Sequence, residues 1–460
     1  MNFLEKKTLI LSGDIKKMIL TLSLPIMLNN LIQTIYNLTD IFFIGKLPGN
    51  KIASISFVWP IIFFMLSFGI GISFAGSGLI SQYIGSNQEN KAKKLSGQII
   101  TFSILFSIIF GIIGSFFSFQ ILSFLGATGD LLIYADKYLN IMFLGMPTMF
   151  IMFAYNAIKN GEGDTLKPML ITLVSVVLNI FLDPIFMFTF KLGISGAAIA
   201  TVISRGIFGT YALITLFSEK NELKLNISDL KIEKDLLIKL LRVGLPASIG
   251  QSTAALGFAV LNIFIVSFGE ETLTAFTLGN RVSSLIMMPA MGIGSALAPI
   301  VGQNIGANQI ERAKKSIKTS VLMTTVFLVI GGIVILYYSS SVLNIFTSDK
   351  EIIRQGIPYL KLITISLPLM GYFQILNGIF QGSGHTKSSM FLMTGRLWIL
   401  RIPTIVILKH FTNLGYFGVW YAMIFSNLIT VLTGYIIYKT GKWQTKIIKE
   451  KKVSFKINAN

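Results

Sequence analysis

Apolar runs long enough to cross a bilayer recur along the whole chain, and short polar clusters separate them. Two examples are "IIFFMLSFGIGISFAGSGLI" at 61–80 and "IITFSILFSIIFGIIGSFFSF" at 99–119. A helix needs about 20 mostly apolar residues to span the hydrocarbon core, whereas a membrane β-strand would alternate apolar and polar positions. The pattern therefore predicts an all-α polytopic membrane protein. Twelve spans are expected near residues 16–44, 53–81, 96–118, 132–157, 168–190, 195–217, 236–267, 273–301, 317–338, 355–380, 390–408 and 416–438.

A weak repeat at an offset of about 221 residues divides the twelve spans into two sets of six. Because six is even, both halves enter the membrane from the same side. This predicts two six-helix lobes related by a pseudo-two-fold axis along the membrane normal, with a substrate pathway between them. The repeated pairs are "LSLPIMLNN" (22–30) with "VGLPASIGQ" (243–251), "SQYIGSNQENKAKK" (81–94) with "GQNIGANQIERAKK" (302–315), "NGEGDT" (160–165) with "QGSGHT" (381–386), and "LGISGAAIATVIS" (192–204) with "LGYFGVWYAMIFS" (414–426).

Basic residues gather in alternate loops, which predicts the orientation of the chain. Roughly 27 Lys and Arg lie on the side that holds both termini and roughly 7 on the other. We therefore expect a multi-pass protein of the cell (inner) membrane with both termini in the cytoplasm. The expected organisation is an N-terminal lobe at 1–218 that carries a cation site, a cytoplasmic linker at 219–235, a C-terminal lobe at 236–440 and a basic cytoplasmic tail at 441–460.

The composition narrows the function classes. Only 13% of residues are charged and the mean hydropathy is +0.72. We therefore expect most of the protein surface to contact the lipid bilayer. The net charge of +19 is explained by the cytoplasmic loops, and we expect no nucleic-acid partner. The chain has no cysteine, two histidines in predicted loops and no phosphate-binding G-x-x-x-x-G-K-[ST] motif. We therefore expect no cofactor, no ATP hydrolysis and no enzyme activity. We also expect no cleavable signal peptide, because the first apolar stretch is short and no small-residue cleavage site follows it.

Two of the 20 acidic residues, Asp40 and Asp183, fall inside predicted spans. Their counterparts across the repeat are Leu261 and approximately Ile402, so only the first half carries them. A carboxylate at the bilayer centre costs about 2.5–3.5 kcal/mol even on the most lenient scale. Each must be neutralised by a proton, a metal cation or a cationic partner, which indicates an exchange site.

Polar residues share helix faces with these two acids. Asp183 follows Asn179 by four residues on the fifth span, and Thr201 follows Ala197 by one turn on the sixth. Interhelical hydrogen bonding is the alternative explanation for such residues, and for single amides and hydroxyls it stays open. On the first span, the residues Asn29, Gln33, Tyr36 and Asp40 lie within roughly 60° of one another. Asn156 is the lone amide of the fourth span.

Two prolines interrupt the hydrogen bonding of these spans. Pro184 cannot donate to the carbonyl of Ile180, and Pro25 leaves the carbonyl of Thr21 free. Freed carbonyls beside a carboxylate are hard oxygen ligands, which suit sodium or a proton. We hypothesise that both prolines let a helix bend when the charge state changes. Normal transport by Pro25→Ala and Pro184→Ala variants would refute this.

Four arginines lie near or within predicted spans. Arg396 could reach the cytoplasmic surface by snorkelling. Arg205, Arg281 and Arg401 could pair with acids, helix carbonyls or lipid phosphate, and their individual roles stay open. A structural or gating role is favoured over substrate binding.

At these motifs the chain resembles the MATE (multidrug and toxic compound extrusion) transporters, and most of all their DinF-like branch. "LPIMLNNLIQTIYNLTDIFFIGKL" looks like the first helix of that family and "VLNIFLDPIF" like the fifth-helix motif of the branch. "GAAIATVISR" looks like the sixth helix and "MPAMGIGSALAPIVGQNIGA" like the eighth-helix signature. The likeness extends over nearly the whole chain.

The resemblance implies a multidrug efflux antiporter. It would export amphipathic, mostly cationic small molecules in exchange for H⁺ or Na⁺ by alternating access, and would be monomeric. A cation site, for which Na⁺ is a candidate, is implied at Asp40, Asn179, Asp183 and Thr201, with the carbonyl of Ala197. The substrate cavity would include Tyr36, Gln33 and Asn156, and Pro25 and Pro184 would bend the helices.

Two rival functions remain at this stage. A flippase for lipid-linked oligosaccharide or peptidoglycan precursors would line a groove with several cationic side chains, whereas the clearest cluster here is acidic. A membrane-embedded enzyme would need catalytic residues near the membrane interface. The duplicated architecture is typical of transporters and disfavours this interpretation. The residues do not distinguish sodium from proton coupling, and they do not identify the drug.

Overall fold

The computed structural model describes residues 1–47, 51–221 and 223–448, and every regular element within these ranges is helical. The first half contains α1 (Phe3–Leu11), α2 (Ile15–Gly45), α3 (Lys51–Gly85), α4 (Glu89–Phe124), α5 (Gly129–Leu144), α6 (Met146–Glu162), α7 (Leu166–Pro184), the π-helix η1 (Ile185–Thr189) and α8 (Ile194–Phe217). The second half contains α9 (Lys234–Val266), α10 (Glu270–Gly306), α11 (Ile310–Phe346), α12 (Lys350–Gly382), α13 (Thr386–Thr394), the π-helix η3 (Gly395–Arg401), α14 (Ile402–Phe411) and α15 (Phe417–Lys439). Two short 3₁₀ turns, η2 (Ile227–Leu230) and η4 (Lys442–Gln444), lie in the linker and after α15.

The twelve predicted spans are confirmed, with one difference in form. Eleven helical segments of the described chain are long and apolar enough to cross a membrane, and α5 with α6 makes a twelfth that is bent by 48°. The bend falls at Gly145, two residues before Pro147. Pro147 has no N–H to donate to the carbonyl of Phe143, so one helical hydrogen bond is missing at the bend.

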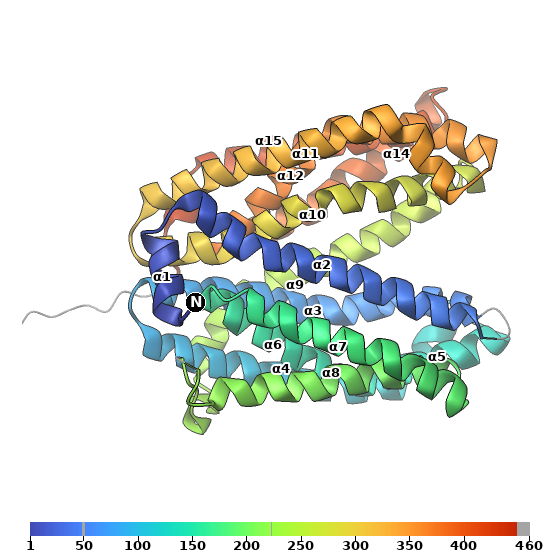
Figure 1. Ribbon diagram of the computed structural model, residues 1–460. Coiled ribbons are helices and arrows are strands. Elements are labelled where there is room, and N and C mark those ends of the chain that lie inside the picture. The colour runs from blue at the N-terminus through green and yellow to red at the C-terminus, as the bar shows by residue number, and fades with distance from the viewer. Residues whose placement is uncertain (48–50, 222, 449–460) are drawn as a thin grey trace, which may run out of the picture.

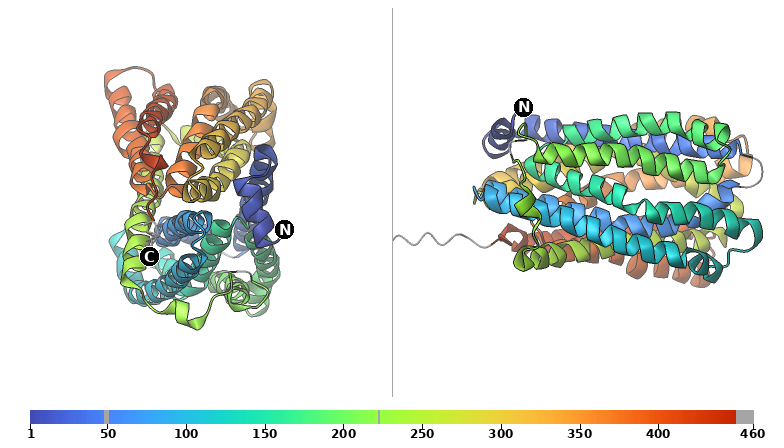
Figure 2. Two further views of the ribbon diagram at one scale, coloured as in Figure 1. Left: turned by 90° about the vertical axis from the view of Figure 1, so that its left-hand side faces the viewer. Right: turned by 90° about the horizontal axis from the view of Figure 1, so that it is seen from below.

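The helices form two lobes that converge at one end of the molecule and diverge toward the other (Figure 1). The N-terminus and the last described residues lie at the convergent end (Figure 2). Of the predicted tail at 441–460, residues 449–460 lie outside the described residues, and residue 222 of the predicted linker does too. Trp443 is buried, so the tail begins as a packed segment.

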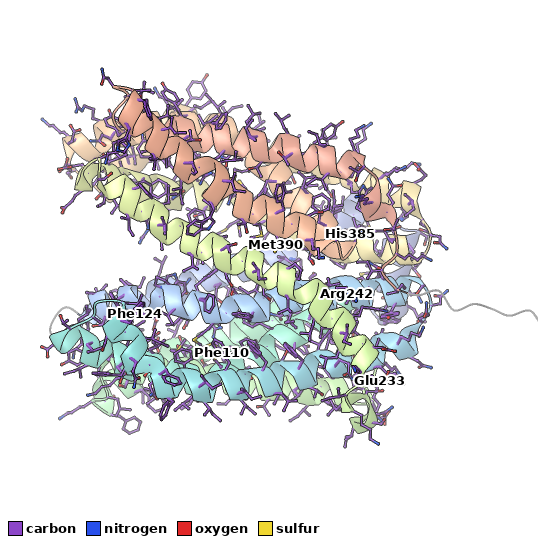
Figure 3. All side chains as sticks on the ribbon, turned by 180° about the vertical axis from the view of Figure 1, so that it is seen from behind. Phe110, Phe124, Glu233, Arg242, His385 and Met390 are labelled. Carbon is purple, nitrogen blue, oxygen red and sulfur yellow. The ribbon has the colours of Figure 1, made fainter. Side chains whose placement is uncertain are left out.

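The helix α9 crosses from one lobe to the other. Figure 3 shows it running diagonally from Glu233 past Arg242. It packs on α3 of the first half and on α13 of the second. α9 approaches α3 closely at Gly71, where an added Cβ would overlap Ser248. At the same place, Ser248 Oγ donates to the Phe68 carbonyl at 3.3 Å. The helix therefore joins the lobes physically as well as in sequence.

The convergent end is closed by a reciprocal pair of contacts between the lobes. Gln82 Nε2 on α3 donates to the carbonyl of Gly382 on α12, and Gln303 Nε2 on α10 donates to the carbonyl of Gly161 on α6, each at 3.2 Å. The sequence repeat relates Gln82 to Gln303 and Gly382 to Gly161, so the two contacts are equivalents of each other. The two glutamines are fully buried. The repeated motifs therefore pack on each other and form a latch with the symmetry of the fold.

The short helix α1, which the sequence pattern did not predict, spans this closed end. Lys6 Nζ lies 2.6 Å from Asp164 Oδ2 between α6 and α7. From the other lobe, Arg312 donates to the carbonyls of Ile10 at 2.9 Å and Gly13 at 2.6 Å. Helix C-termini present free carbonyls that such a cation satisfies. The segment is too short and too polar to register as a span, which is why periodicity missed it.

The ion pair of α1 gives a pH-dependent stability prediction. Burial alone would raise the pKa of Asp164, but its hydrogen bond and ion pair with Lys6, supported by Lys167, hold that pKa below its usual value. A lowered folded-state pKa contributes stability above the unfolded value of about 4, and this is lost as the pH falls through the folded pKa. We expect Asp164→Asn to lower the melting temperature at neutral pH, with the deficit shrinking below pH ~4. Thermal melts in detergent across pH measure this.

The control for this prediction is Asp235→Asn. Asp235 lies at the start of α9, is exposed and forms no ion pair among the described residues. Its variant should melt like the wild type at every pH. An Asp164→Asn deficit that stayed constant down to pH ~3 would contradict the role given to this carboxylate.

Candidate functional site

The two intramembrane aspartates meet in the first lobe. Asp40 on α2 is 8% exposed and Asp183 at the end of α7 is fully buried. The two carboxyl groups are close enough to interact electrostatically. No salt bridge to either is formed within the described part of the chain. By contrast, the buried Glu162 pairs with Lys159 at 2.7 Å.

Amide and hydroxyl groups surround this pair. As the helical spacing predicts, Asn179 faces Asp183, and its Nδ2 donates to Asp183 Oδ1 at 3.1 Å. Tyr36 Oη and Thr201 Oγ1 form a hydrogen bond of 2.9 Å between α2 and α8. Ala197 is fully buried one turn before Thr201. Three helices thus bring together residues that are far apart in sequence.

Three buried oxygens of the cluster have no hydrogen-bond partner among the described residues: Asp40 Oδ1, Asn179 Oδ1 and Asp183 Oδ2. Leaving buried polar atoms unpaired is costly, and a functional role is one common reason for it. All three are hard oxygen acceptors, which are the ligands of Na⁺ and the binding atoms of a proton. In the described ranges, no group of three or more His, Cys, Asp or Glu side chains is placed so that it could hold a metal ion.

The local backbone explains how Asp183 reaches the cluster. α7 ends at Pro184 and continues as the π-helix η1, so the chain loosens where the proline removes a donor. Gly196 on α8 packs against this π-turn, and a Cβ there would lie 2.7 Å from the Phe186 carbonyl carbon. The close packing holds the end of α7 and its π-turn against α8. Pro25, in contrast, lies inside an uninterrupted α2.

Two residues near the cluster were not assigned to it from the sequence. Tyr138 on α5 is 4% exposed and interacts electrostatically with both aspartates. Arg205, whose role was open, interacts with Asp40 and has its guanidinium carbon 5.3 Å from the ring centroid of Tyr36. A tyrosine in an apolar helix carries no sequence signal of this kind, because its position depends on how α5 packs.

A large cavity of the molecule is separate from this cluster, because neither aspartate is part of its lining. Its volume is about 960 Å³, and its walls come from α3, α9, α10, α12, α13, η3 and α15, with Asn30 from α2. Tyr36, Gln33 and Asn156, which the resemblance placed beside the substrate, are not part of its lining. Gln33 and Asn156 are half-buried, and Asn156 Oδ1 has no partner among the described residues.

Arg396 and Arg401 line this cavity. The suggestion that Arg396 snorkels to the surface is therefore wrong. Its side chain is 7% exposed and lies over the ring of Phe373, with the guanidinium carbon 4.6 Å from the centroid. The π-helix η3 turns it toward the interior, which no helical wheel of fixed period predicts. Arg281 on α10 is exposed.

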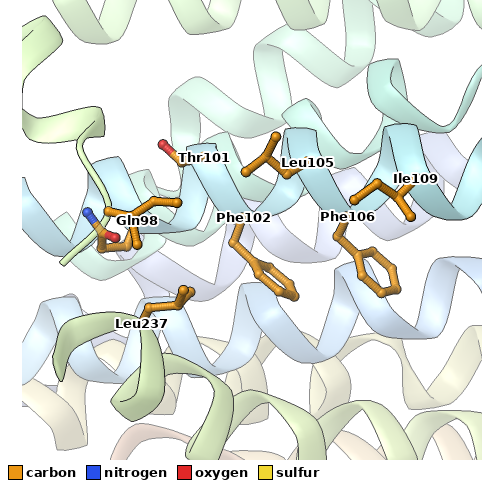
Figure 4. A pocket seen from close by; sticks show the side chains of 8 residues that line it. Gln98, Thr101, Phe102, Leu105, Phe106, Ile109 and Leu237 are labelled. Atoms are coloured by element: carbon orange, nitrogen blue, oxygen red, sulfur yellow. The ribbon is translucent and has the colours of Figure 1, made fainter. Parts of the chain in front are cut away.

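A second, smaller pocket of about 200 Å³ lies between α4, the linker and α9 (Figure 4). Its walls are mostly apolar and half-exposed, with Phe102, Leu105 and Ile109 among them, and it contains no charged side chain. Such a surface is suited to contact with lipid acyl chains. The chemistry of the molecule lies in the cluster and the large cavity.

Comparison with known proteins agrees with this architecture. The MatE family model matches residues 25–185 and again residues 246–407, so the matches are separated like the internal motifs. The "Probable multidrug resistance protein YoeA" of Bacillus subtilis is 31% identical over 441 residues, covering 92% of this chain and 94% of that protein. The "Multidrug export protein MepA" of Staphylococcus haemolyticus is 29% identical, covering 93% and 94%.

Solved structures show the same fold. A "Crystal structure of MATE in complex with MaL6" superposes with a TM-score of 0.89 at 25% identity, covering 94% of this chain and 97% of that one. An "Outward-facing conformation of a multidrug resistance MATE family transporter of the MOP superfamily" superposes with a TM-score of 0.88 and the same coverage. The chain belongs to the MATE family of multi-pass membrane transporters.

Proposed function

We propose that this protein exports amphipathic small molecules from the cytoplasm in exchange for H⁺ or Na⁺. The observation that carries the proposal is the pair of buried carboxylates, Asp40 and Asp183, which form no salt bridge within the described residues and leave oxygens without a hydrogen-bond partner there. Such a site is neutral only when it holds a cation. The names of the curated relatives support multidrug export and do not favour a lipid-precursor flippase.

The helix α2 connects the cation cluster to the cavity. Asn30 lines the cavity, while Tyr36 and Asp40 lie in the cluster further along the same helix. Near Pro25, α2 packs on α10 of the other lobe, where a Cβ on Gly292 would lie 3.1 Å from the carbonyl of Ser23. A change of charge at Asp40 therefore acts on a helix that contacts both lobes.

The transport cycle follows from these contacts. With the termini in the cytoplasm, the closed latch of Gln82 and Gln303 seals the inner side, and the cavity faces outward. A cation from outside neutralises the Asp40 and Asp183 cluster, α2 shifts and the affinity for the exported molecule falls. The emptied protein then opens inward and releases the cation. Only ligands with different affinities for the two states can drive such a cycle.

The experiment uses purified protein in proteoliposomes with one of two fluorescent dyes, ethidium or tetramethylrhodamine. Sodium and proton gradients are imposed separately. We expect one gradient to drive accumulation of dye above its equilibrium level and the other to fail, which identifies the coupling ion. Dye movement that ignores both gradients would contradict the proposal. Turnover of a lipid substrate without any gradient would point to an enzyme instead.

A further inference from the structure

The large cavity carries positive charge and no negative charge. Among the described residues that line it, Arg396 and Arg401 are the charged ones, and neither Asp nor Glu is present. The two side chains are only 7% and 3% exposed. Asp40 and Asp183 are not part of the lining, so they offer no acid inside the cavity itself.

The protein satisfies these two guanidinium groups with neutral atoms. Arg401 donates from Nε to Ser426 Oγ at 3.0 Å and from Nη2 to Asn427 Oδ1 at 2.7 Å. Arg396 donates from Nη1 to the sulfur of Met370 at 3.0 Å, and its Nε has no partner among the described residues. Neutral acceptors do not cancel a buried charge, so both groups lack a counter-ion within the described part of the chain.

The π-helix η3 brings the two arginines to one wall. They are five residues apart, which on a regular α-helix would point them about 140° away from each other. The π-helix pairs residues i and i+5 in its hydrogen bonding, so residues five apart come close to the same side. Pro403 follows on the next turn, where it cannot donate to a preceding carbonyl. The π-helix therefore places both arginines on the same wall of the cavity.

The rest of the lining suits an aromatic body. The side chains of Trp59, Phe63, Phe258 and Phe373 line the cavity together with several methionines. Trp59 and Phe63 lie with their ring centroids 6.4 Å apart on α3. A volume of about 960 Å³ is in the range of sites for drug-sized molecules.

We propose that the cavity binds the anionic group of an aromatic amphiphile, with Arg396 and Arg401 as its counter-ions. A carboxylate matches the planar donors of a guanidinium in two parallel hydrogen bonds. The inference rests on the proposed export function and specifies its cargo. Zwitterions, which carry a cationic group as well, are included. The expectation of mostly cationic cargo came from the family resemblance, and the acidic cluster that agrees with it lies outside this cavity.

A matched pair of dyes tests the inference without any mutation. Tetramethylrhodamine has a free carboxylate, and its methyl ester has the same fluorophore without that charge. Fluorescence anisotropy of each dye with purified wild-type protein measures the two dissociation constants. We expect the acid to bind roughly tenfold or more tightly than the ester, as a charge-assisted pair in a buried site requires. Equal affinities would overturn the inference.

Variants assign the preference to the cavity. Arg396→Met should remove most of the preference for the acid and keep the binding of the ester, because methionine fills a similar apolar space beside Met370. Arg396→Lys retains the positive charge and should keep part of the preference for the acid. Arg281→Met, on an exposed position of α10, should leave both dissociation constants unchanged. A preference that survives in Arg396→Met and Arg401→Met alike would overturn the assignment.

Two further outcomes separate this inference from the proposed function. If the ester binds as tightly as the acid and is accumulated by an ion gradient, the export function stands and the anion site fails. If neither dye binds and neither is accumulated, both fail. Farnesyl pyrophosphate serves as a lipid anion in competition. Its displacement of the acid at lower concentration than free tetramethylrhodamine would place a lipid pyrophosphate, and not a drug carboxylate, in the cavity.

Discussion

Replacing Asp183 with asparagine is expected to abolish ion-driven accumulation of the exported dye. Asparagine keeps the shape of the side chain, and it carries no charge for a cation to neutralise. A transporter without coupling can only equilibrate its cargo, so the ratio of dye concentrations across the membrane should fall to about one. Asp40→Asn should have the same effect, because both carboxylates belong to one electrostatic cluster. Proteoliposomes with the coupling gradient measure the ratio.

The matched control is Asp130→Asn. Asp130 is an exposed acid in the first turn of α5, outside the cluster. Its variant should accumulate dye like the wild type. If Asp183→Asn protein inserts and melts normally and still accumulates dye against the gradient, the cluster is not the coupling site. Loss of accumulation in Asp130→Asn as well would show that the assay reports general damage.

Adding a methyl group to Gly85 or Gly306 is expected to open the closed end of the molecule. A Cβ on Gly85 would overlap the carbonyl oxygen of Gln303, and a Cβ on Gly306 would overlap that of Gln82, so neither fits while the lobes touch. The neighbours are backbone atoms, which cannot move aside as a side chain can. Overpacking of about 1–3 kcal/mol would raise the population of the opened state by about 5- to 150-fold.

Thiol labelling measures this opening. The chain has no cysteine, so an introduced thiol is the only one that can react with the label. Ser81 is fully buried beside Gly302 at the closed end, so a Ser81→Cys thiol should react slowly with a maleimide. The Gly85→Ala and Gly306→Ala changes should accelerate labelling. Gly45→Ala is the control, since its nearest neighbour, Ile52 Cδ1, lies at an ordinary 3.5 Å. Unchanged labelling in both latch variants would show that these glycines do not hold the lobes together.

Much of the fold was predictable from the sequence because each bilayer-spanning helix requires a long apolar run, which is visible in the sequence. The bend at Gly145 was not, because one proline in an apolar run leaves open whether the helix kinks or continues. The helix α1 was missed for a different reason: its docking depends on Asp164 and Arg312, which are distant in sequence.

The candidate site was predictable only in part. The helical spacing predicts the contact between Asn179 and Asp183. The cost of burying a charge identifies Asp40 as a functional candidate. The neighbourhood of Tyr138 and the inward turn of Arg396 depend on packing and on a π-helix, which a fixed period of 3.6 residues cannot show. The assignment to the DinF-like branch, the coupling ion and the monomeric state stay predictions.

The central claim is that cation binding at the Asp40 and Asp183 cluster lowers the affinity for the exported molecule. It is tested most directly by measuring the dissociation constant of tetramethylrhodamine with purified protein as a function of sodium concentration at fixed pH, and of pH without sodium. Linkage requires that a cation which weakens dye binding is itself bound more weakly in the presence of dye. We predict that one of the two cations weakens dye binding in the wild type and has no effect in the Asp40→Asn, Asp183→Asn double variant. Undiminished dependence on that cation in the double variant would contradict the account.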